Sequence, residues 1–267
     1  MFGEGNKGFI MAKSFIYPVA TATITDGTRG ESVNGDVEYT FYSSDAVTNE
    51  HRISDDSIGS AISGFESDDV LRFDLGASYA CDVIAVYMLS SDGTNMELYY
   101  GSSSTAMGYD TTMPITTTPT MSAEFTAGWT VRTFTEATKQ YWFVRAAGDI
   151  NPAEIIIGKK YDFDVNPELN NKIGEEFGTD IMTSYGGQEY ANKRHAPKTT
   201  WSWNWAYLSS SQKTSLEGLN SSVQDHKKFI YDDETTKHYV RMTKPLEFTE
   251  VAPSVYSTSM TLREQLA

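Results

Sequence analysis

The sequence has a single cysteine and no long apolar run. Because Cys81 has no possible partner within the chain, an intrachain disulfide framework is excluded. Cys81 precedes the apolar run VIAVYML, so we expect it to be a small buried residue. No stretch approaches the roughly 18 apolar residues of a membrane span, and the start MFGEGNKGFIMAKSF lacks the apolar stretch of a signal peptide. We expect no membrane insertion and no export.

Positive charge is also scarce. The chain has 21 Lys and Arg against 36 Asp and Glu, which gives a net charge of -15. A surface of this sign repels phosphate backbones, so a nucleic-acid partner is disfavoured. The same acidic surface keeps a concentrated protein in solution.

Residue clusters that carry chemistry are missing from the sequence. The four histidines, His51, His195, His226 and His238, are not spaced as zinc ligands. No nucleophile elbow and no glycine-rich phosphate loop is found. We therefore predict no catalytic residue, no cofactor and no metal site, and we interpret the chain as a protein other than an enzyme.

Adjacent acids occur at Asp55-Asp56, Asp68-Asp69 and Asp232-Asp233. Two carboxylates roughly 5–10 Å apart across a cleft could hydrolyse a glycoside. Neighbours on a strand point to opposite faces, however, so we interpret these pairs as solvated loops and the last as a turn. A structural calcium ion held by loop oxygens of the first domain is an alternative.

Short extended runs separated by Gly, Asp, Asn and Ser predict an all-β chain. Leu71, Phe73 and Leu75 alternate with polar residues, as in a half-buried strand. Asp26-Gly27 and Asp92-Gly93 predict tight turns. A Thr/Pro loop is expected at 111–122, and further strands are expected at 83–91, 95–102, 130–134, 140–148, 153–165, 228–233, 238–242 and 254–265. This pattern favours an antiparallel sandwich.

A change of composition divides the chain near residues 161–170, where an apolar run gives way to a polar Asn-Pro segment. We expect a flexible, glycine-containing arm at 1–14, within which Met11 is an alternative start. The first domain should comprise 15–160 and the second 161–267.

One helix is expected, in the second domain, within SSSQKTSLEGLNSSV. Ser209 and Gln212 have the spacing of a capping box. Leu216, Leu219 and Val223 recur at helical spacing, which predicts one buried face.

The stretch TTWSWNWAYLSSSQ places Trp201, Trp203, Trp205 and Tyr207 at every second position. Period two puts all four aromatic side chains on one face of a strand. We interpret this face as core, or as core plus subunit interface, because the apolar face of a strand is normally buried. A ligand platform is the alternative, since a solvent-facing aromatic row needs something to cover it. Further core or interface candidates are Phe229, Tyr231, Tyr239 and Tyr256.

The first domain carries LRFDLGASYACDVIAVYML, then MELYYGSSS, WTVRTF, YWFVRAAG and AEIIIGKKY. This order resembles the discoidin, or coagulation-factor type C, family of galactose-binding domains, over roughly residues 15–160. The resemblance implies an eight-stranded jelly roll whose tip loops bind carbohydrate or membrane surfaces, sometimes with a calcium ion. The family's terminal cysteine pair is missing here, and the resemblance assigns no ligand-binding residue.

The last hundred residues carry YGGQEYANKRHAPKTTWSWNWAYLSSSQKTSLEGL, then KFIYDD, HYVRMTKPLEFTEVAP and SVYSTSMTLREQL. This pattern resembles the tail-tip proteins of long-tailed bacteriophages, the distal tail and minor tail families. The residues in matching places are Phe229, Tyr231, Tyr239, Val240, Tyr256, Met260, Leu262 and Glu264. The resemblance implies a tail-tube-like β-sandwich whose copies join edge to edge into a ring, usually a hexamer.

Three functions are compatible with these patterns. The first is a virion structural protein of a phage tail, assembled in the host cytoplasm, whose ring joins the tail tube to the baseplate or tip. Its partners would be further copies, other tail proteins and, through the outer jelly roll, host-surface glycan. The alternatives are a carbohydrate-binding module or adhesin, and a glycan-degrading enzyme.

Overall fold

The computed structural model describes residues 13–28, 39–40, 58–59, 61, 69–90, 95–101, 106–107, 121–146, 148–163, 167 and 172–265. The chain forms two compact units. The N-terminal unit comprises Ile16–Lys160, and the C-terminal unit comprises Tyr161–Leu266 together with Met1–Phe15. Most of the expected arm, residues 1–12, lies outside the described part, whereas Ser14 is buried in strand β1 (Ser14–Pro18).

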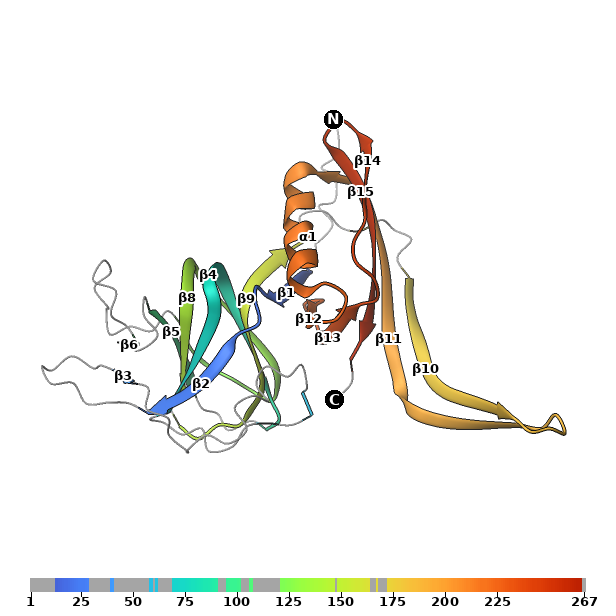
Figure 1. The fold of residues 1–267 in the computed structure, drawn as a ribbon, viewed down its shortest axis with the longest axis horizontal. Coiled ribbons are helices and arrows are strands. Elements are labelled where there is room, and N and C mark those ends of the chain that lie inside the picture. Colours follow the sequence, from blue (N-terminus) through green and yellow to red (C-terminus); the bar gives the residue numbers. More distant parts are fainter. Residues whose placement is uncertain are drawn as a thin grey trace, which may run out of the picture. The chain divides into compact units, whose positions relative to one another are not determined.

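The all-β class expected from the sequence is confirmed. The described residues form strands β1 to β15 and one helix, α1 (Figure 1). No described helix is both long and apolar enough to cross a membrane.

The N-terminal unit is an antiparallel arrangement in the order β9-β4-β8-β5-β7, with β2 beside the first half of β4 and β3 paired with β6. The strands are β2 (Thr23–Thr28), β3 (Tyr39–Thr40), β4 (Asp69–Met88), β5 (Asn95–Gly101), β6 (Ala106–Met107), β7 (Met121–Glu124), β8 (Gly128–Ala146) and β9 (Pro152–Asp162).

A large apolar core lies in the N-terminal unit, and both halves of β4 contribute to it. Leu71 and Phe73 come from the first half, and Ile84 and Val86 come from the second. They pack with Trp142 of β8, which is fully buried. The strands expected at 71–76 and 83–91 are therefore one bent strand that lines the same core twice.

The Asp-Leu-Gly sequence at 74–76 produces an irregularity in β4. The side chain of Asp74 accepts a hydrogen bond from the backbone N–H of Gly76 (2.8 Å) and another from Gln140 (2.8 Å). Gly76 has a φ of 77°, which glycine adopts without steric cost. The pairing of β4 with β8 shifts register between Asp74 and Tyr79, so the strand bends just after this motif.

Cys81 follows this irregularity and is fully buried, as the sequence predicted. Burial raises the pKa of its thiol to about 12, and the neighbouring Asp82 carboxylate adds to the effect. The thiol is therefore protonated at neutral pH and is a structural group.

The turn predicted at Asp26-Gly27 is wrong. Both residues lie inside β2, where Asp26 pairs with Leu71 and Gly27 with Val70 of β4. The pairing partner outweighs the local turn preference of the dipeptide. The turn expected at Asp92-Gly93 and nearly all of the Thr/Pro loop at 111–122 lie outside the described residues, which resume at Met121.

The C-terminal unit is also antiparallel, in the order β10-β11-β15-β13-β12, with β14 beside β15. Its elements are β10 (Lys172–Thr183), β11 (Glu189–Ser209), α1 (Ser210–Val223), β12 (Lys228–Asp232), β13 (Lys237–Met242), β14 (Phe248–Ala252) and β15 (Val255–Glu264).

The tryptophan row of β11 forms the core of this unit. The side chains of Trp201, Trp203 and Trp205 are at most 4% exposed. The ring of Phe15 lies 5.7 Å from that of Trp203, and the ring of Tyr231 lies 4.8 Å from it. Edge-to-face and tilted ring contacts of this kind stabilise a core beyond the area that they bury.

The other aromatic candidates divide between core and surface. Phe229, Tyr231 and Tyr239 are buried, whereas Tyr256 is half-buried with the amino group of Lys213 over its ring at 4.9 Å. Tyr207 is 75% exposed, so the expectation that it shares the face of the tryptophans is wrong.

A register shift explains the position of Tyr207. The pairing of β11 with β15 is regular to Trp205 and resumes at Leu208, with an irregularity between them. The extra residue reverses the alternation, so Leu208 is buried in place of Tyr207.

The predicted helix and its capping box are confirmed in α1. The backbone N–H of Gln212 donates to the side-chain oxygen of Ser209 (3.3 Å), and the side chain of Gln212 accepts from the N–H of Ser209 (2.8 Å). Leu216, Leu219 and Val223 are the buried residues of the helix, as their spacing predicted.

The substitution Trp203→Ala should lower the free energy of unfolding by roughly 3–5 kcal/mol, because it leaves a cavity among the surrounding rings. Urea denaturation followed by fluorescence measures the loss. The control Tyr207→Ala removes an exposed ring of the same strand and should change stability by less than about 0.5 kcal/mol. Equal losses in the two variants would contradict the assignment of Trp203 to the core.

Candidate functional site

The most distinctive feature of the described structure is the hairpin formed by β10 and β11. Strand β15 pairs with β11 only from Thr200 to Ser209. Beyond Thr200, residues 175–199 are a two-stranded ribbon that extends past the rest of its unit, and residues 172–174 form its base beside Thr200–Ser202 (Figure 1). No other described strand pairs with β10 or with residues 189–199 of β11, so both edges of the ribbon are open.

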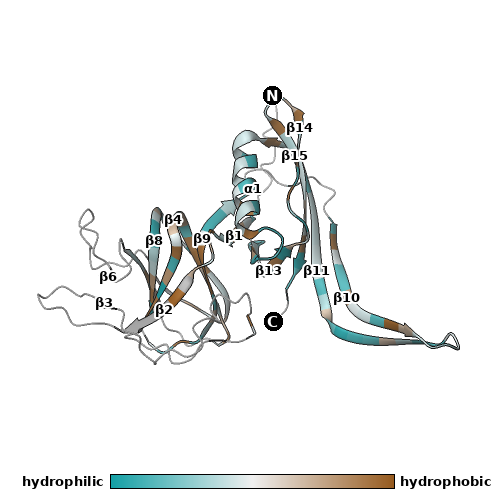
Figure 2. Cartoon of the chain, in the orientation of Figure 1, coloured by the Kyte–Doolittle hydropathy of each residue, from teal (hydrophilic) through white to brown (hydrophobic). Residues whose placement is uncertain are grey.

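Apolar side chains are exposed along this ribbon, and we call the ribbon with these side chains the assembly hairpin. Each of the following is more than half exposed: Ile173, Phe177, Ile181, Met182, Tyr185 and Tyr190. Figure 2 shows the apolar segments of β10 within an otherwise hydrophilic hairpin. They occur on both faces, since Ile181 and Met182 are adjacent on one strand. Exposed apolar side chains at this density are typical of a surface that binds another molecule.

The two strands of the assembly hairpin differ in charge. Strand β10 carries Glu175, Glu176 and Asp180, whereas the paired part of β11 carries Lys193, Arg194 and Lys198. Within the hairpin, Arg194 forms an ion pair with Asp180. Glu176 pairs in register with Lys198 and binds the guanidinium of Arg263 on β15 (2.6 Å). One open edge is therefore mainly acidic and the other mainly basic.

The hairpin bends near Gly178. Register shifts occur on both sides of this residue, between Glu176 and Gly178 and between Gly178 and Thr179. The imidazole of His195 lies over Gly178, where a Cβ atom would come within 2.2 Å of the ring nitrogen Nε2. Glycine is thus needed at 178 because the ring occupies the space of a side chain, and the irregularities bend the ribbon (Figure 1).

A polar cluster fixes the base of the hairpin to the sheet. The Glu264 carboxylate accepts hydrogen bonds from the Thr199 backbone N–H (3.0 Å) and lies 3.2 Å from His238 Nδ1. The other nitrogen, Nε2, lies 3.4 Å from Asp233, which accepts from the N–H groups of Thr235 and Thr236. Strands β11, β13 and β15 are thereby linked where the ribbon leaves the unit.

These contacts change the pKa values of both carboxyl groups. Burial alone would raise the pKa of Glu264, but the hydrogen bonds from Thr199 and His238 outweigh it and lower the pKa. In the same way, burial raises the pKa of Asp233, while the Thr235 and Thr236 amides and His238 bring it below its ordinary value. The cluster therefore favours charged carboxylates.

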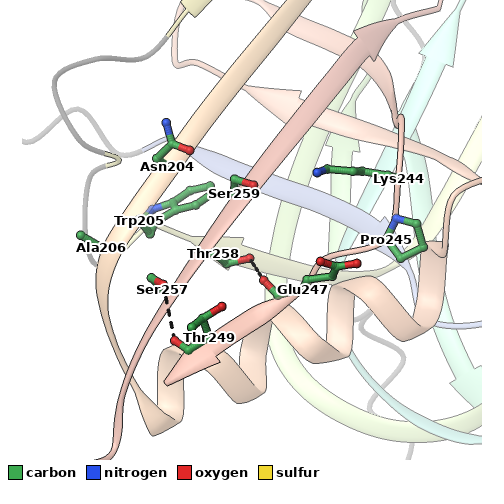
Figure 3. Close-up of a pocket in the computed structure, with 10 residues that line it drawn as sticks. All are labelled: Asn204, Trp205, Ala206, Lys244, Pro245, Glu247, Thr249, Ser257, Thr258 and Ser259. Atoms are coloured by element: carbon green, nitrogen blue, oxygen red, sulfur yellow. Dashed lines mark hydrogen bonds between the residues drawn. The ribbon is translucent and has the colours of Figure 1, made fainter. Parts of the chain in front are cut away.

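A pocket of about 370 Å³ lies on the outer face of the same unit, between β11, β15 and the segment before β14 (Figure 3). Its lining is Asn204, Trp205, Ala206, Lys244, Pro245, Glu247, Thr249, Ser257, Thr258 and Ser259. Thr258 donates to the Glu247 carbonyl oxygen (2.7 Å), and Ser257 donates to that of Thr249 (3.4 Å). Trp205 is only 3% exposed, so it offers little ring surface to a ligand in this open, polar hollow.

The histidines, which could act in catalysis or bind a metal ion, lie apart from one another. His195, His226 and His238 lie in different parts of the C-terminal unit, and His51 is outside the described residues. Across the residues that the structure describes, no group of three or more His, Cys, Asp and Glu side chains is placed to hold a metal ion.

The acidic pairs are only partly covered by the structure. Asp55-Asp56 and Asp68, which the calcium alternative concerns, lie outside the described residues. Asp232 ends β12 and binds Lys237 (3.6 Å), and Asp233 begins the turn to β13. The pair thus forms part of a turn, in agreement with its interpretation from the sequence.

The assembly hairpin itself was missed by the sequence reasoning, which assigned no strand to residues 172–199. A signal was present in Tyr185-Gly186-Gly187, a glycine pair between extended runs. Gly187 has a φ of 79°, and its N–H donates to the carbonyl of Ser184 (2.9 Å) to close the turn.

Comparisons with known proteins find similarity only among solved structures. No protein-family model matches the chain, and no curated protein matches it. The resemblance of the last hundred residues to phage tail-tip proteins therefore depends on the sequence pattern alone.

The similar structures each span about half of this chain. A chitosan-binding module of a chitosanase/glucanase from Paenibacillus sp. IK-5 is 14% identical, with a TM-score of 0.35 over 54% of this chain and 98% of the module. The module CpGH89CBM32-5 from Clostridium perfringens, in complex with GalNAc-β-1,3-galactose, is 11% identical, with a TM-score of 0.38 over 54% and 99%. A Streptococcus pneumoniae fucose binding module is 12% identical, with a TM-score of 0.32 over 59% and 99%.

The substitution Glu264→Gln should lower the free energy of unfolding at pH 6 by about 1 kcal/mol, because hydrogen bonds to a charged acceptor contribute more than bonds to a neutral one. The folded-state pKa of Glu264 is lowered, so its contribution is present above the unfolded value of about 4.3 and is lost as the pH falls below it.

Urea denaturation at pH 6 and pH 3 measures this effect. The parent should lose more stability between the two pH values than Glu264→Gln does. The exposed Glu189 supplies a control, because Glu189→Gln should leave the pH dependence of the parent unchanged. Parallel profiles for parent and Glu264→Gln would contradict a stabilising role of the Glu264 carboxylate.

Proposed function

We propose that this protein is a structural component that assembles into a homo-oligomer through the assembly hairpin. The observation that supports this proposal is the two-stranded ribbon of residues 175–199, with both edges open and apolar side chains on both faces. An isolated two-stranded ribbon is at best marginally stable in water. Burial against other protein would stabilise it and would pair its edges.

The molecular setting that we propose is a phage tail. The sequence pattern of the last hundred residues supports a distal tail or minor tail protein, whose ring would join the tail tube to the baseplate or tip. In this proposal the protein is a part of the virion and has no catalytic role. Its partners are further copies of itself and the adjoining tail proteins.

Purified parent protein should have the native mass of a closed oligomer, about six copies in the proposed ring, when measured by light scattering. A matched variant replaces residues 177–197 by Asn-Gly, which joins Glu176 to its cross-strand partner Lys198 in a two-residue hairpin. This variant should be monomeric, because it lacks most of the exposed apolar surface.

Circular dichroism and thermal melting of the variant provide the control, since the tryptophan core and α1 are unaltered. A folded variant with the native mass of the parent would show that assembly uses another surface. A parent that stays monomeric at its highest soluble concentration would contradict the proposed function.

A second candidate function is glycan binding by the N-terminal unit. It is supported by the discoidin-like order of sequence motifs, of which Asp74-Leu75-Gly76 forms a defined irregularity of β4. This function is compatible with the first, because the motifs lie in the unit that does not carry the assembly hairpin.

The glycan function predicts binding of a defined sugar by the intact protein on an array. Chitosan oligosaccharides, GalNAc-β-1,3-galactose and fucose are the first probes. The variant with the shortened hairpin serves as the control, because it should bind the same sugar if the N-terminal unit is responsible. Absence of binding across the array would exclude this second function.

A further inference from the structure

The charges of the assembly hairpin define how two copies meet. We infer that the acidic edge strand β10 of one copy pairs with the basic edge of β11 in the next copy, so that copies join head to tail. This inference depends on the proposed function and specifies the surface that carries it. The occupant of each open edge is a second copy of this chain.

The direction of the strands is compatible with this pairing. Strand β10 is antiparallel to β11 within the hairpin. If a second copy follows by translation or rotation about a ring axis, its β10 keeps the direction of the first β10. It is then antiparallel to the β11 that it approaches, and the ladder continues without reversal.

The lengths of the two edges also match. Strand β10 extends over Lys172–Thr183, and the open part of β11 extends over residues 189–199, after which β15 takes the place of a partner. In the register of the hairpin, Glu175–Thr183 of a neighbouring β10 match this open edge, and its Lys172–Gly174 lie past it, where β15 already pairs with β11. This limits the contact to the ribbon and leaves the sheet of each unit intact.

The side chains repeat across such a contact. Within the hairpin, Glu176 pairs with Lys198 and Met182 pairs with Tyr190. If the β10 of a neighbouring copy pairs in the same register, its Glu176 lies opposite Lys198 of the first copy and its Met182 lies opposite Tyr190 of the first copy. Each intermolecular pair thus reproduces an intramolecular pair of opposite charge or of apolar side chains, which stabilises neighbouring strands.

The charges of the two edges explain why the acidic edge of one copy must meet the basic edge of the next. Each copy carries a net charge of -15, so unrelated surfaces of two copies repel one another. Two β10 edges would bring Glu175, Glu176 and Asp180 together, and two β11 edges would bring the basic side chains together. Only the pairing of an acidic edge with a basic edge avoids both arrangements.

Charge reversal tests the inference in the full chain. The acidic edge is reversed by Glu175→Lys with Asp180→Lys, and the basic edge by Lys193→Glu with Arg194→Glu. Glu175, Lys193 and Arg194 are exposed and Asp180 is half-buried, and the Asp180–Arg194 ion pair that is lost is a surface pair of small energetic value. The buried tryptophan core is unaltered, so both variants should keep the cooperative melting transition of the parent.

Each reversed variant alone should be monomeric by light scattering, because its two edges carry the same sign. An equimolar mixture should recover the native mass of the parent, because the two variants then present complementary edges to each other. A matched control reverses two exposed charges elsewhere, Lys244→Glu with Glu250→Lys, and should assemble as the parent does.

The outcomes separate this inference from the proposed function. A reversed variant that assembles alone, or two folded variants that fail to assemble when mixed, would overturn the acid-to-base pairing while the parent still forms an oligomer. A monomeric parent would overturn the proposed function itself, and the inference with it. Recovery of the oligomer only in the mixture supports both.

Discussion

The packing of aromatic rings around Trp203 is the interaction on which the C-terminal unit depends. Phe15, near the start of the chain, and Tyr231, in a strand more than 200 residues later, both contact this indole. The rings therefore bring together segments that no local interaction connects. Because this core fixes β11 from Trp201 onward, it also anchors the hairpin that the same strand continues.

Unpaired strand edges provide the second constraint. A sheet edge presents unpaired backbone N–H and C=O groups, and another strand can form hydrogen bonds with them. In the assembly hairpin two such edges occur together with exposed apolar side chains, and the Glu264 cluster secures the ribbon at its base. In the proposed function these features together are the basis of self-assembly, and the second candidate function is assigned to the N-terminal unit.

Small irregularities in the strands determine which side chains are presented. The shift after Trp205 exposes Tyr207 and buries Leu208, and the shifts around Gly178 bend the ribbon. Each irregularity depends on the pairing partner, as at Asp26-Gly27, where a dipeptide typical of turns lies in a strand beside β4. A period-two pattern cannot predict them, because one extra residue reverses the alternation.

Local patterns in the sequence determined the all-β class, the buried alternation of Leu71 and Phe73, the capping box at Ser209 and the burial of the tryptophan row. These features follow from side-chain spacing and from short-range hydrogen bonds. The tertiary structure decided the position of Phe15 in the C-terminal core and the continuity of β4. It also decided the extension of β10 and β11 beyond β15, because that depends on where a partner strand ends, and the partner lies more than fifty residues away.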